Sequence, residues 1–144
     1  TTEIYTLSLH AALPIFASYA DLAPRSRFSV VGESLVLPLE RAIPLGLLLN
    51  ELISNSLKYA GRDGEGCSME LSLDEALGET VRLRYADDGP GLPAGADIDA
   101  PETLGLQLVS VLAEQAGARI AKDESVPSGF VIRLHMGEAR PARA

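Results

Sequence analysis

The sequence predicts a single domain of the α/β class, with two amphipathic helices among several short strands. Helical spacing of apolar residues marks Arg41–Ala60 and Thr103–Gly117, and a glycine stands at or just after the end of each stretch. At 144 residues, the chain is long enough to bury a core in one compact domain. The strands are expected at shorter apolar or alternating segments: Arg27–Val31, Leu35–Leu39 (or a lead into the helix), Glu70–Leu73, Val81–Ala86, Arg119–Lys122 and Phe130–Met136.

The composition restricts the kinds of partner. The formal net charge is −8, and an acidic surface repels phosphate backbones and anionic lipid, so we expect no nucleic-acid partner and no membrane contact. A polyanionic ligand would need a local site built from backbone N–H groups, a metal and a few cations. The one cysteine, Cys67, cannot form an internal disulfide, which favours a reducing, cytoplasmic setting. The longest apolar run, Ala42–Leu49, is too short to span a bilayer.

The first predicted helix carries an unusual polar stripe. At about 100° per residue, Asn55 lies about 40° to one side of Glu51 and Lys58 about 20° to the other. The stripe could be a solvated face with a Glu–Lys pair two turns apart. Asparagine, however, is a poor helix former that an exposed face does not require. Its carboxamide oxygen suits Mg²⁺, the carboxylate could hold a metal-bound water or orient a nucleophile, and the ammonium could meet a phosphate.

The turn at Asp87–Gly91 follows the alternating strand directly. Asp-Gly and Pro-Gly are strong turn formers, so a plain surface turn is one interpretation. In the other, Gly89 and Gly91 let the backbone approach a flat ligand closely, and Asp87 accepts a hydrogen bond from an exocyclic amine such as adenine N6. A carboxylate accepts but does not donate, which would favour adenine over guanine. Asp87–Glu102 is a long loop, and such loops are often functional lids.

The second predicted helix has Gly105 in its first turn. A helix N-terminus that a phosphate can approach across glycine is a general anion site, but helix–sheet packing explains the glycine equally well. Thr103 is a candidate N-cap and Gly117 a candidate stop. The expected core-facing stripe of this helix consists of Leu104, Leu108, Val111 and Leu112.

Four segments in this order resemble the N box, G1 box, G2 box and closing strand of the histidine-kinase ATPase domain, which has the Bergerat ATP-binding fold. They are LGLLLNELISNSLKYA (Leu45–Ala60), ADDGPGLP (Ala86–Pro93), TLGLQLVSVLAEQAG (Thr103–Gly117) and SGFVIRL (Ser128–Leu134). The resemblance covers about Arg27 to Met136 and suggests sensor histidine kinases with the second type of phosphoacceptor domain. It implies a two-layer α/β (α+β) sandwich, a mixed β-sheet covered on one face by helices, and nucleotide bound between helix and sheet.

The resemblance also implies roles at the phosphate end of an ATP site. Asn55 would coordinate a Mg²⁺ ion that bridges the ATP phosphates, and Glu51 would lie beside the metal as water-orienter or base. Lys58 would contact phosphate, and Tyr59 would lie near the nucleotide.

At the other end of that site, Asp87 would bind adenine N6, and Gly89 and Gly91 would shape the adenine pocket. Gly105 and Leu106 would hold the base of the ATP lid. The G2 region has a single glycine after Glu102 and no separate phenylalanine-bearing box precedes it, so we expect a short lid that closes differently.

The histidines fit no phosphoacceptor pattern. His135 is expected in the last strand, and His10 stands near the N-terminus. The resemblance therefore implies that the phosphorylated histidine belongs to a phosphoacceptor and dimerisation domain upstream of this chain, with a response regulator as the next partner. Two other functions stay open: a serine kinase of the anti-sigma-factor type, and a degenerate nucleotide-binding or protein-binding module.

The segments outside residues 27–136 are expected to lie outside the catalytic domain. Residues 1–26 form an N-terminal segment in which Glu3–Phe16 resembles the translation of sequencing-adapter read-through; an ordinary connecting helix is the other interpretation. Residues 137–144 are polar and predict a flexible tail.

Overall fold

The computed structural model describes residues 4–7, 10, 12–19, 21, 24–32, 35–59, 66–77, 80–91, 104–135 and 140–141. Its main element is a five-stranded sheet in the order β2-β4-β5-β7-β6. β2 and β4 pair in parallel and the other neighbours are antiparallel, which makes the sheet mixed, as expected. The strands are β2 (Arg27–Val31), β4 (Ser68–Leu77), β5 (Thr80–Asp87), β6 (Ala118–Lys122) and β7 (Gly129–His135).

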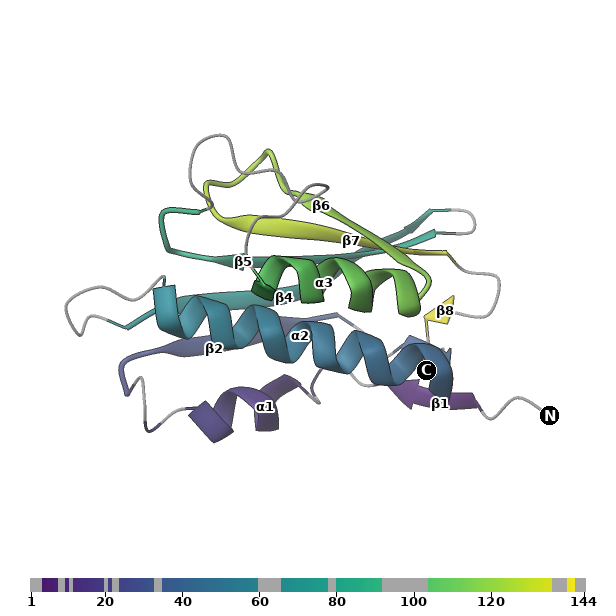
Figure 1. Cartoon of the computed structure of the whole chain (residues 1–144), viewed down its shortest axis with the longest axis horizontal. Coiled ribbons are helices and arrows are strands. Elements are labelled where there is room, and N and C mark those ends of the chain that lie inside the picture. Colours follow the sequence, from purple (N-terminus) through teal and green to yellow (C-terminus); the bar gives the residue numbers. More distant parts are fainter. Residues whose placement is uncertain are drawn as a thin grey trace.

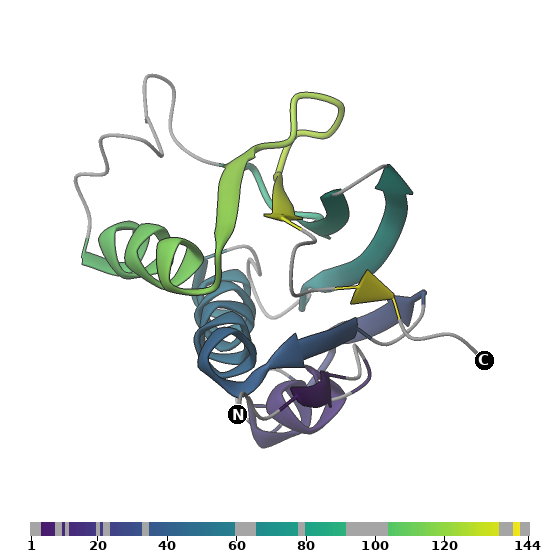
Figure 2. The same ribbon diagram turned by 90° about the vertical axis from the view of Figure 1, so that its right-hand side faces the viewer.

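Two long helices cover one face of this sheet, α2 (Leu39–Tyr59) and α3 (Leu104–Gln115) (Figures 1 and 2). The sheet turns alternate residues of β5 toward them, so Val81, Leu83 and Tyr85 are at most 2% exposed. The facing residues of α2 follow helical spacing and are at most 4% exposed: Leu45, Leu48, Leu49, Leu52 and Ile53. The two-layer sandwich that the sequence predicts is therefore confirmed, and its core lies between α2, α3 and the sheet.

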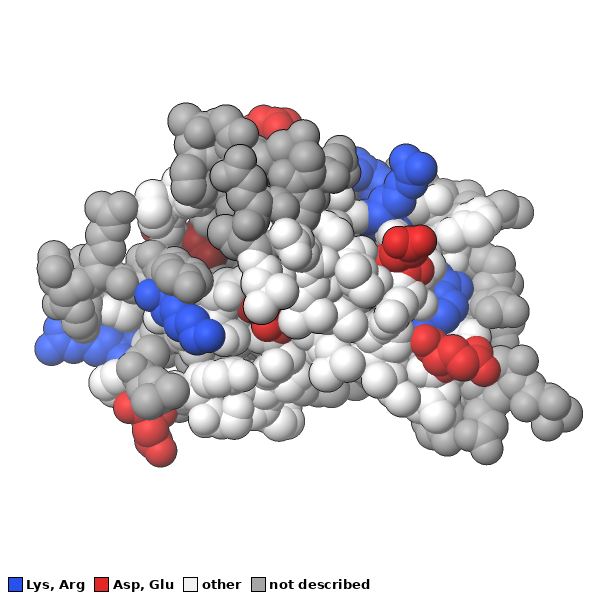
Figure 3. Space-filling view, in the orientation of Figure 1, with Lys and Arg blue, Asp and Glu red and all other residues white. Residues whose placement is uncertain are grey.

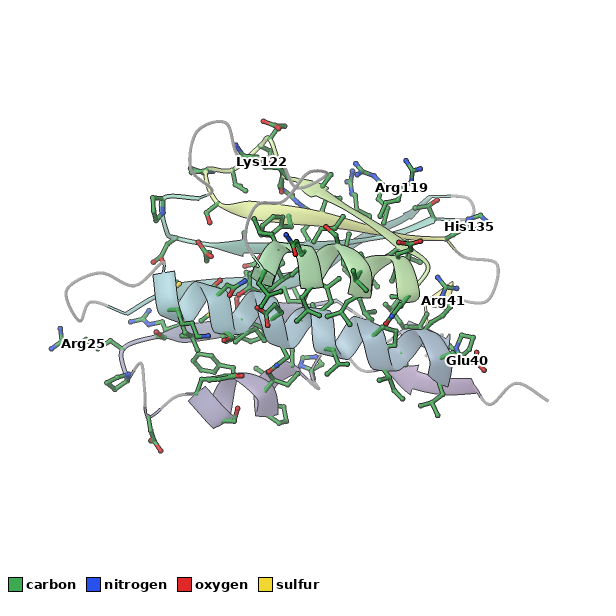
Figure 4. All side chains as sticks on the ribbon, viewed as in Figure 1. Arg25, Glu40, Arg41, Arg119, Lys122 and His135 are labelled. Carbon is green, nitrogen blue, oxygen red and sulfur yellow. The ribbon has the colours of Figure 1, made fainter. Side chains whose placement is uncertain are left out.

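The helices α2 and α3 run antiparallel, and Arg41 ties the start of α2 to the end of α3. Its guanidinium donates hydrogen bonds to the carbonyl oxygens of Ala116 at 2.8 Å, Gly117 at 3.3 Å and His135 at 2.9 Å. Gly117 has a φ of +68° and ends α3, as predicted. The last carbonyls of a helix lack partners within the helix, so Arg41 adds donors and a positive charge at this end of α3. Figure 4 shows Arg41 beside this end of α3, with His135 close by.

The expected core-facing stripe of α3 is wrong. Leu104 is 80% exposed, Leu108 44% and Val111 50%. The buried side of α3 carries Val109, Leu112 and Ala113, of which only Leu112 was expected. The helix is apolar on nearly every side, so two stripes have helical spacing; the side with the small alanine is the one that fits closely against α2 and the sheet. The outer side forms part of a surface with few charged side chains (Figure 3).

A second, three-stranded sheet was not predicted. Its central strand β3 (Leu35–Pro38) pairs antiparallel with β1 (Ile4–Leu7) and with the short β8 (Arg140–Pro141). Two residues of the predicted tail therefore extend this sheet.

The N-terminal helix α1 (Ala12–Tyr19) packs on the main domain. The ring of Phe16 stacks on Phe28 of β2 at a centroid distance of 5.7 Å, and the Tyr19 hydroxyl donates to Asn50 Oδ1 at 3.1 Å. The origin of residues 3–16 stays a prediction, but this helix does contribute contacts. No helix among the described residues combines the length and apolar character needed to cross a membrane.

Candidate functional site

The first turn of α3 lies against the polar stripe of α2. A β-carbon built on Gly105 would lie 3.1 Å from Glu51 Oε1 and 3.6 Å from Asn55 Nδ2. Glu51 and Asn55 are both partly exposed, and Lys58, in the last turn of α2, is exposed. The structure thus brings together a carboxylate, a carboxamide and a helix N-terminus.

This arrangement offers two kinds of binding group side by side. The N–H groups in the first turn of a helix have no partners within the helix and can bind an anion. Carboxylate and carboxamide oxygens are ligands that Mg²⁺ accepts, usually together with waters and substrate phosphates. Because Gly105 has no side chain, it leaves open the space beside Glu51 and Asn55 that a β-carbon would occupy.

Asp87, the last residue of β5, lies next to α2 and is held by two donors. The Ser56 hydroxyl donates to Asp87 Oδ2 at 2.6 Å, and the Gly89 N–H donates to Asp87 Oδ1 at 2.9 Å. Ser56 Oγ also lies 2.8 Å from the Tyr85 hydroxyl, which is 3.2 Å from the carbonyl oxygen of Leu52. A buried chain of hydroxyl groups therefore links α2, β5 and the Asp87 carboxylate.

The backbone around Asp87 is fixed by its neighbours. The Asp87 N–H donates to the carbonyl oxygen of Ser128, and Asp88 exchanges hydrogen bonds with Ser68 through its N–H and its carboxylate. Asp88 is exposed. Of the two adjacent aspartates, Asp87 is the one that faces α2.

The two glycines of this turn have partners within the protein. Gly91 has a φ of +82°, and a β-carbon on it would overlap the carbonyl oxygen of Pro127 in the turn between β6 and β7. Gly89 uses its N–H for Asp87. Protein packing thus already accounts for the glycine at 91, and an approach to a flat ligand stays a prediction for both residues.

Some predicted site features lie outside the described residues. These are the side chain of Tyr59, the candidate N-cap Thr103 and residues 92–103, which include most of the predicted lid. Leu106 is half-buried in the first turn of α3.

Burial shifts two ionisable groups near Asp87. Burial, reinforced by the negative charge of Asp87, raises the pKa of Cys67 to about 12, so this thiol stays protonated near neutral pH and is a poor nucleophile. Burial also raises the pKa of Tyr85 above its usual range. Tyr85 therefore keeps its proton and can act as a hydrogen-bond donor in the hydroxyl chain.

The sequence matches a known protein family over the part of the chain that forms this site. The family model described as histidine kinase-, DNA gyrase B- and HSP90-like ATPase matches residues 40–140. The chain belongs to this family. The matched part contains α2 from its second residue onward, the turn after β5 and the start of α3, which are the three elements that form the site.

Curated relatives of the chain include sensor kinases. It is 33% identical over 132 residues to the sensor histidine kinase PdtaS of Mycolicibacterium smegmatis, covering 87% of this chain and 26% of the relative. It is 30% identical over 94 residues to the blue-light-activated histidine kinase 2 of Erythrobacter litoralis, covering 65% of this chain and 27% of the relative. The chain spans about a quarter of the length of these relatives.

Solved structures confirm the fold of this ATPase-family domain. The histidine kinase domain from the Erythrobacter litoralis EL346 blue-light-activated histidine kinase aligns with a TM-score of 0.73 at 24% identity, over 90% of this chain and 61% of that chain. The mycobacterial sensor histidine kinase MprB aligns with a TM-score of 0.70 at 17% identity, over 99% of this chain and 100% of that chain. The predicted histidine-kinase-type ATPase fold is therefore confirmed.

Two residues were missed from the sequence: Ser56, which belongs to this ATPase-family site, and Arg41, which holds the far ends of α2 and α3 together. Ser56 is 4% exposed and lies on the apolar side of α2, where a hydroxyl needs a buried partner; that pattern alone could have singled it out. Arg41 gave no such signal, because its three carbonyl partners are distant in sequence.

Proposed function

We propose that this chain binds Mg·ATP between α2 and the sheet and acts as the catalytic domain of a sensor histidine kinase. The observation that carries the proposal is the position of Gly105, in the first turn of α3, beside Glu51 and Asn55. Here α2, which carries the N box, meets α3, which carries the G2 box. Ser56, the residue after Asn55, donates a hydrogen bond to Asp87 of the G1 box.

At the adenine end, Asp87 would accept a hydrogen bond from the exocyclic amine of the base. A carboxylate offers about four lone-pair positions, and Ser56 and Gly89 occupy one on each oxygen. Acceptor positions remain for a ligand amine. A guanine would present its carbonyl oxygen here instead, and two acceptors facing each other repel.

At the phosphate end, Asn55 would hold Mg²⁺ through its carboxamide oxygen, and the donor set next to Gly105 fits such an ion. When bound, Mg²⁺ would neutralise part of the phosphate charge. The N–H groups at the start of α3 would bind phosphate oxygens, and Lys58, at the exposed end of α2, would reach the phosphates as a point charge. Glu51 would orient the attacking group. Phosphoryl transfer then requires mainly positioning and electrostatic stabilisation.

The phosphoacceptor would come from another domain. His135 lies beside Arg41, whose guanidinium binds its carbonyl oxygen. At a rise of about 1.5 Å per residue along α2, Arg41 and Asn55 are about 20 Å apart, so His135 is remote from the phosphate end. We therefore propose a phosphoacceptor and dimerisation domain as the first partner and a response regulator as the second, in the cytoplasm, where ATP is supplied.

Nucleotide binding tests the proposal directly. If the Kd is about 10 µM, then about 1 mM Mg·ATP should raise the free energy of unfolding by about 2.7 kcal/mol, measured by thermal or urea unfolding. Removing Mg²⁺ with a chelator should reduce this gain, and Asp87→Asn should abolish most of it. An unchanged melting temperature with Mg·ATP would instead favour a protein-binding module that has lost nucleotide binding.

A further inference from the structure

Ser56 occupies an unusual place in α2. It follows Asn55 in sequence but lies on the buried side of the helix, with an exposed fraction of 4%. Its Oγ lies 2.6 Å from Asp87 Oδ2 and 2.8 Å from the hydroxyl oxygen of Tyr85, which is 2% exposed. The hydroxyl of Ser56 is therefore enclosed between a carboxylate and a phenol.

Counting hydrogens fixes the direction of the bond between Ser56 and Asp87. Ser56 and Tyr85 have one hydroxyl hydrogen each, so two hydrogens are available. Each of three contacts needs a hydrogen: Ser56 to Asp87, Ser56 to Tyr85, and Tyr85 to the Leu52 carbonyl. A carboxylate has no hydrogen to donate, and a hydrogen bond to a charged acceptor is the strongest of the three. The Ser56 hydrogen therefore points to Asp87, and Tyr85 donates either to Ser56 or to Leu52.

The two donors to Asp87 come from different elements. Ser56 on α2 holds Oδ2, and the Gly89 N–H in the turn holds Oδ1. The torsion that rotates a carboxylate is soft, so one donor alone would leave the plane of the group poorly defined. Together they set the directions of the remaining lone pairs before a ligand arrives, and such preorganisation improves affinity and selectivity.

We propose that Ser56 is a specificity-determining positioning residue for the nucleotide base: it orients the Asp87 carboxylate toward the 6-amino group of a purine, and Tyr85 holds Ser56 in place. The proposal rests on the proposed function, because it assumes that Asp87 meets the base. Its distinguishing consequence is that the effect of Ser56 depends on the 6-amino group of the ligand. A serine that only stabilised the fold would affect every nucleotide alike.

The test compares two nucleotides on the full chain in the presence of Mg²⁺. ATP and purine riboside triphosphate, which is ATP without the 6-amino group, compete with a fluorescent nucleotide. We expect the wild type to prefer ATP by about tenfold, the value of one hydrogen bond to a charged group. In Ser56→Ala, we expect this preference to fall to about twofold, with the affinity for purine riboside triphosphate nearly unchanged.

The chain offers a matched control in Ser54, which is also a buried serine of α2, at 7% exposure. It lies on a different side of the helix from Ser56, so Ser54→Ala should keep the tenfold preference. Ser56→Thr retains the hydroxyl and should also keep the tenfold preference for ATP. Tyr85→Phe leaves the Ser56 hydroxyl in place without its support, so the preference should fall by about twofold to threefold; this variant carries the test if Ser56→Ala does not fold.

The outcomes separate this proposal from the proposed function. If the wild type binds both nucleotides equally, Asp87 does not meet the 6-amino group, and both ideas fail at the adenine end. If the wild type prefers ATP and Ser56→Ala keeps the same preference, Ser56 is not a specificity residue, although the nucleotide site stands. An equal loss of affinity for both nucleotides in Ser56→Ala would also overturn the proposal, because it would show a structural effect only.

Discussion

Gly105 in the first turn of α3 lies beside the carboxylate of Glu51 on α2: a β-carbon on Gly105 would come 3.1 Å from Glu51 Oε1. This spacing is tight enough that a β-carbon at position 105 would displace the carboxylate by a few tenths of an ångström. Gly105 is also the point at which α3 meets the polar stripe of α2. Glycine is therefore required at position 105 by the neighbouring carboxylate, and not by helix formation.

Gly105→Ala should separate stability from nucleotide function. Glycine is about 1 kcal/mol worse than alanine in a helix, and Gly105 has no left-handed φ, so the melting temperature should stay the same or rise. The Glu51 carboxylate must move by a few tenths of an ångström, and phosphoryl transfer to a supplied acceptor domain should fall by about tenfold or more. Unchanged transfer would show that the position of Glu51 is not critical.

Gly91→Ala serves as the contrasting substitution. Here the φ is +82° and the new β-carbon would overlap the Pro127 carbonyl oxygen. Both effects act on the folded state, so the free energy of unfolding should fall by about 2 kcal/mol or more, measured by urea unfolding. Equal melting temperatures for the two alanine variants would contradict the distinction drawn between the glycines.

The local pattern of apolar residues was sufficient to predict most helices and strands of the main domain. The strand Arg27–Val31 was predicted with its observed bounds, and the boundaries of α2 and α3 differ from the predicted ones by only one or two residues. The small sheet was missed because β1 and β8 are short and become strands only through pairing with β3, which is distant in the sequence. Such pairing leaves little trace in local periodicity.

Candidate site residues could be identified from the sequence where the residue type was unusual for its position in a helix or strand. Asn55 in mid-helix and Asp87 at the end of a strand stood out, and the structure places them on adjoining elements. The orientation of α3 could not be predicted, because both of its stripes have helical spacing and packing selected the one with smaller residues. Ser56 was missed because it lies on the buried side of α2, away from the polar stripe that carries Glu51 and Asn55.

Arg41 should contribute substantially to stability. Its guanidinium serves three carbonyl oxygens at the end of α3 and of β7, so Arg41→Met should lower the free energy of unfolding by about 2 kcal/mol. Arg41→Lys should recover only part of this, since an ammonium lacks the planar fork that reaches several carbonyls. The exposed Arg119 is the control: Arg119→Met should change stability by less than about 0.5 kcal/mol. Similar stabilities for the two methionine variants would rule out the bridging role.

Asp123 should make the fold sensitive to acid. Hydrogen bonds from Ser125 and the Arg84 guanidinium lower the pKa of Asp123 to about 2. The unfolded chain has the ordinary value of about 3.9, so the native state binds fewer protons and this contribution to stability is complete above about pH 4. It is lost as the pH falls toward 2. Urea unfolding at several pH values should show a smaller acid-dependent loss for Asp123→Asn than for wild type, and equal losses would contradict the assignment.

The last prediction concerns the buried side of α3, because the sequence predicts that Leu108 is buried and the structure shows it exposed. Leu112 is 6% exposed and Leu108 is 44% exposed, although both belong to the stripe that the sequence predicted. Leu112→Ala should therefore lower the free energy of unfolding by about 2 to 4 kcal/mol through lost burial and a new cavity. Leu108→Ala should cost less than about 1 kcal/mol, because its side chain is already partly in water. If urea unfolding showed comparable losses for both, α3 would present the predicted stripe to the core after all.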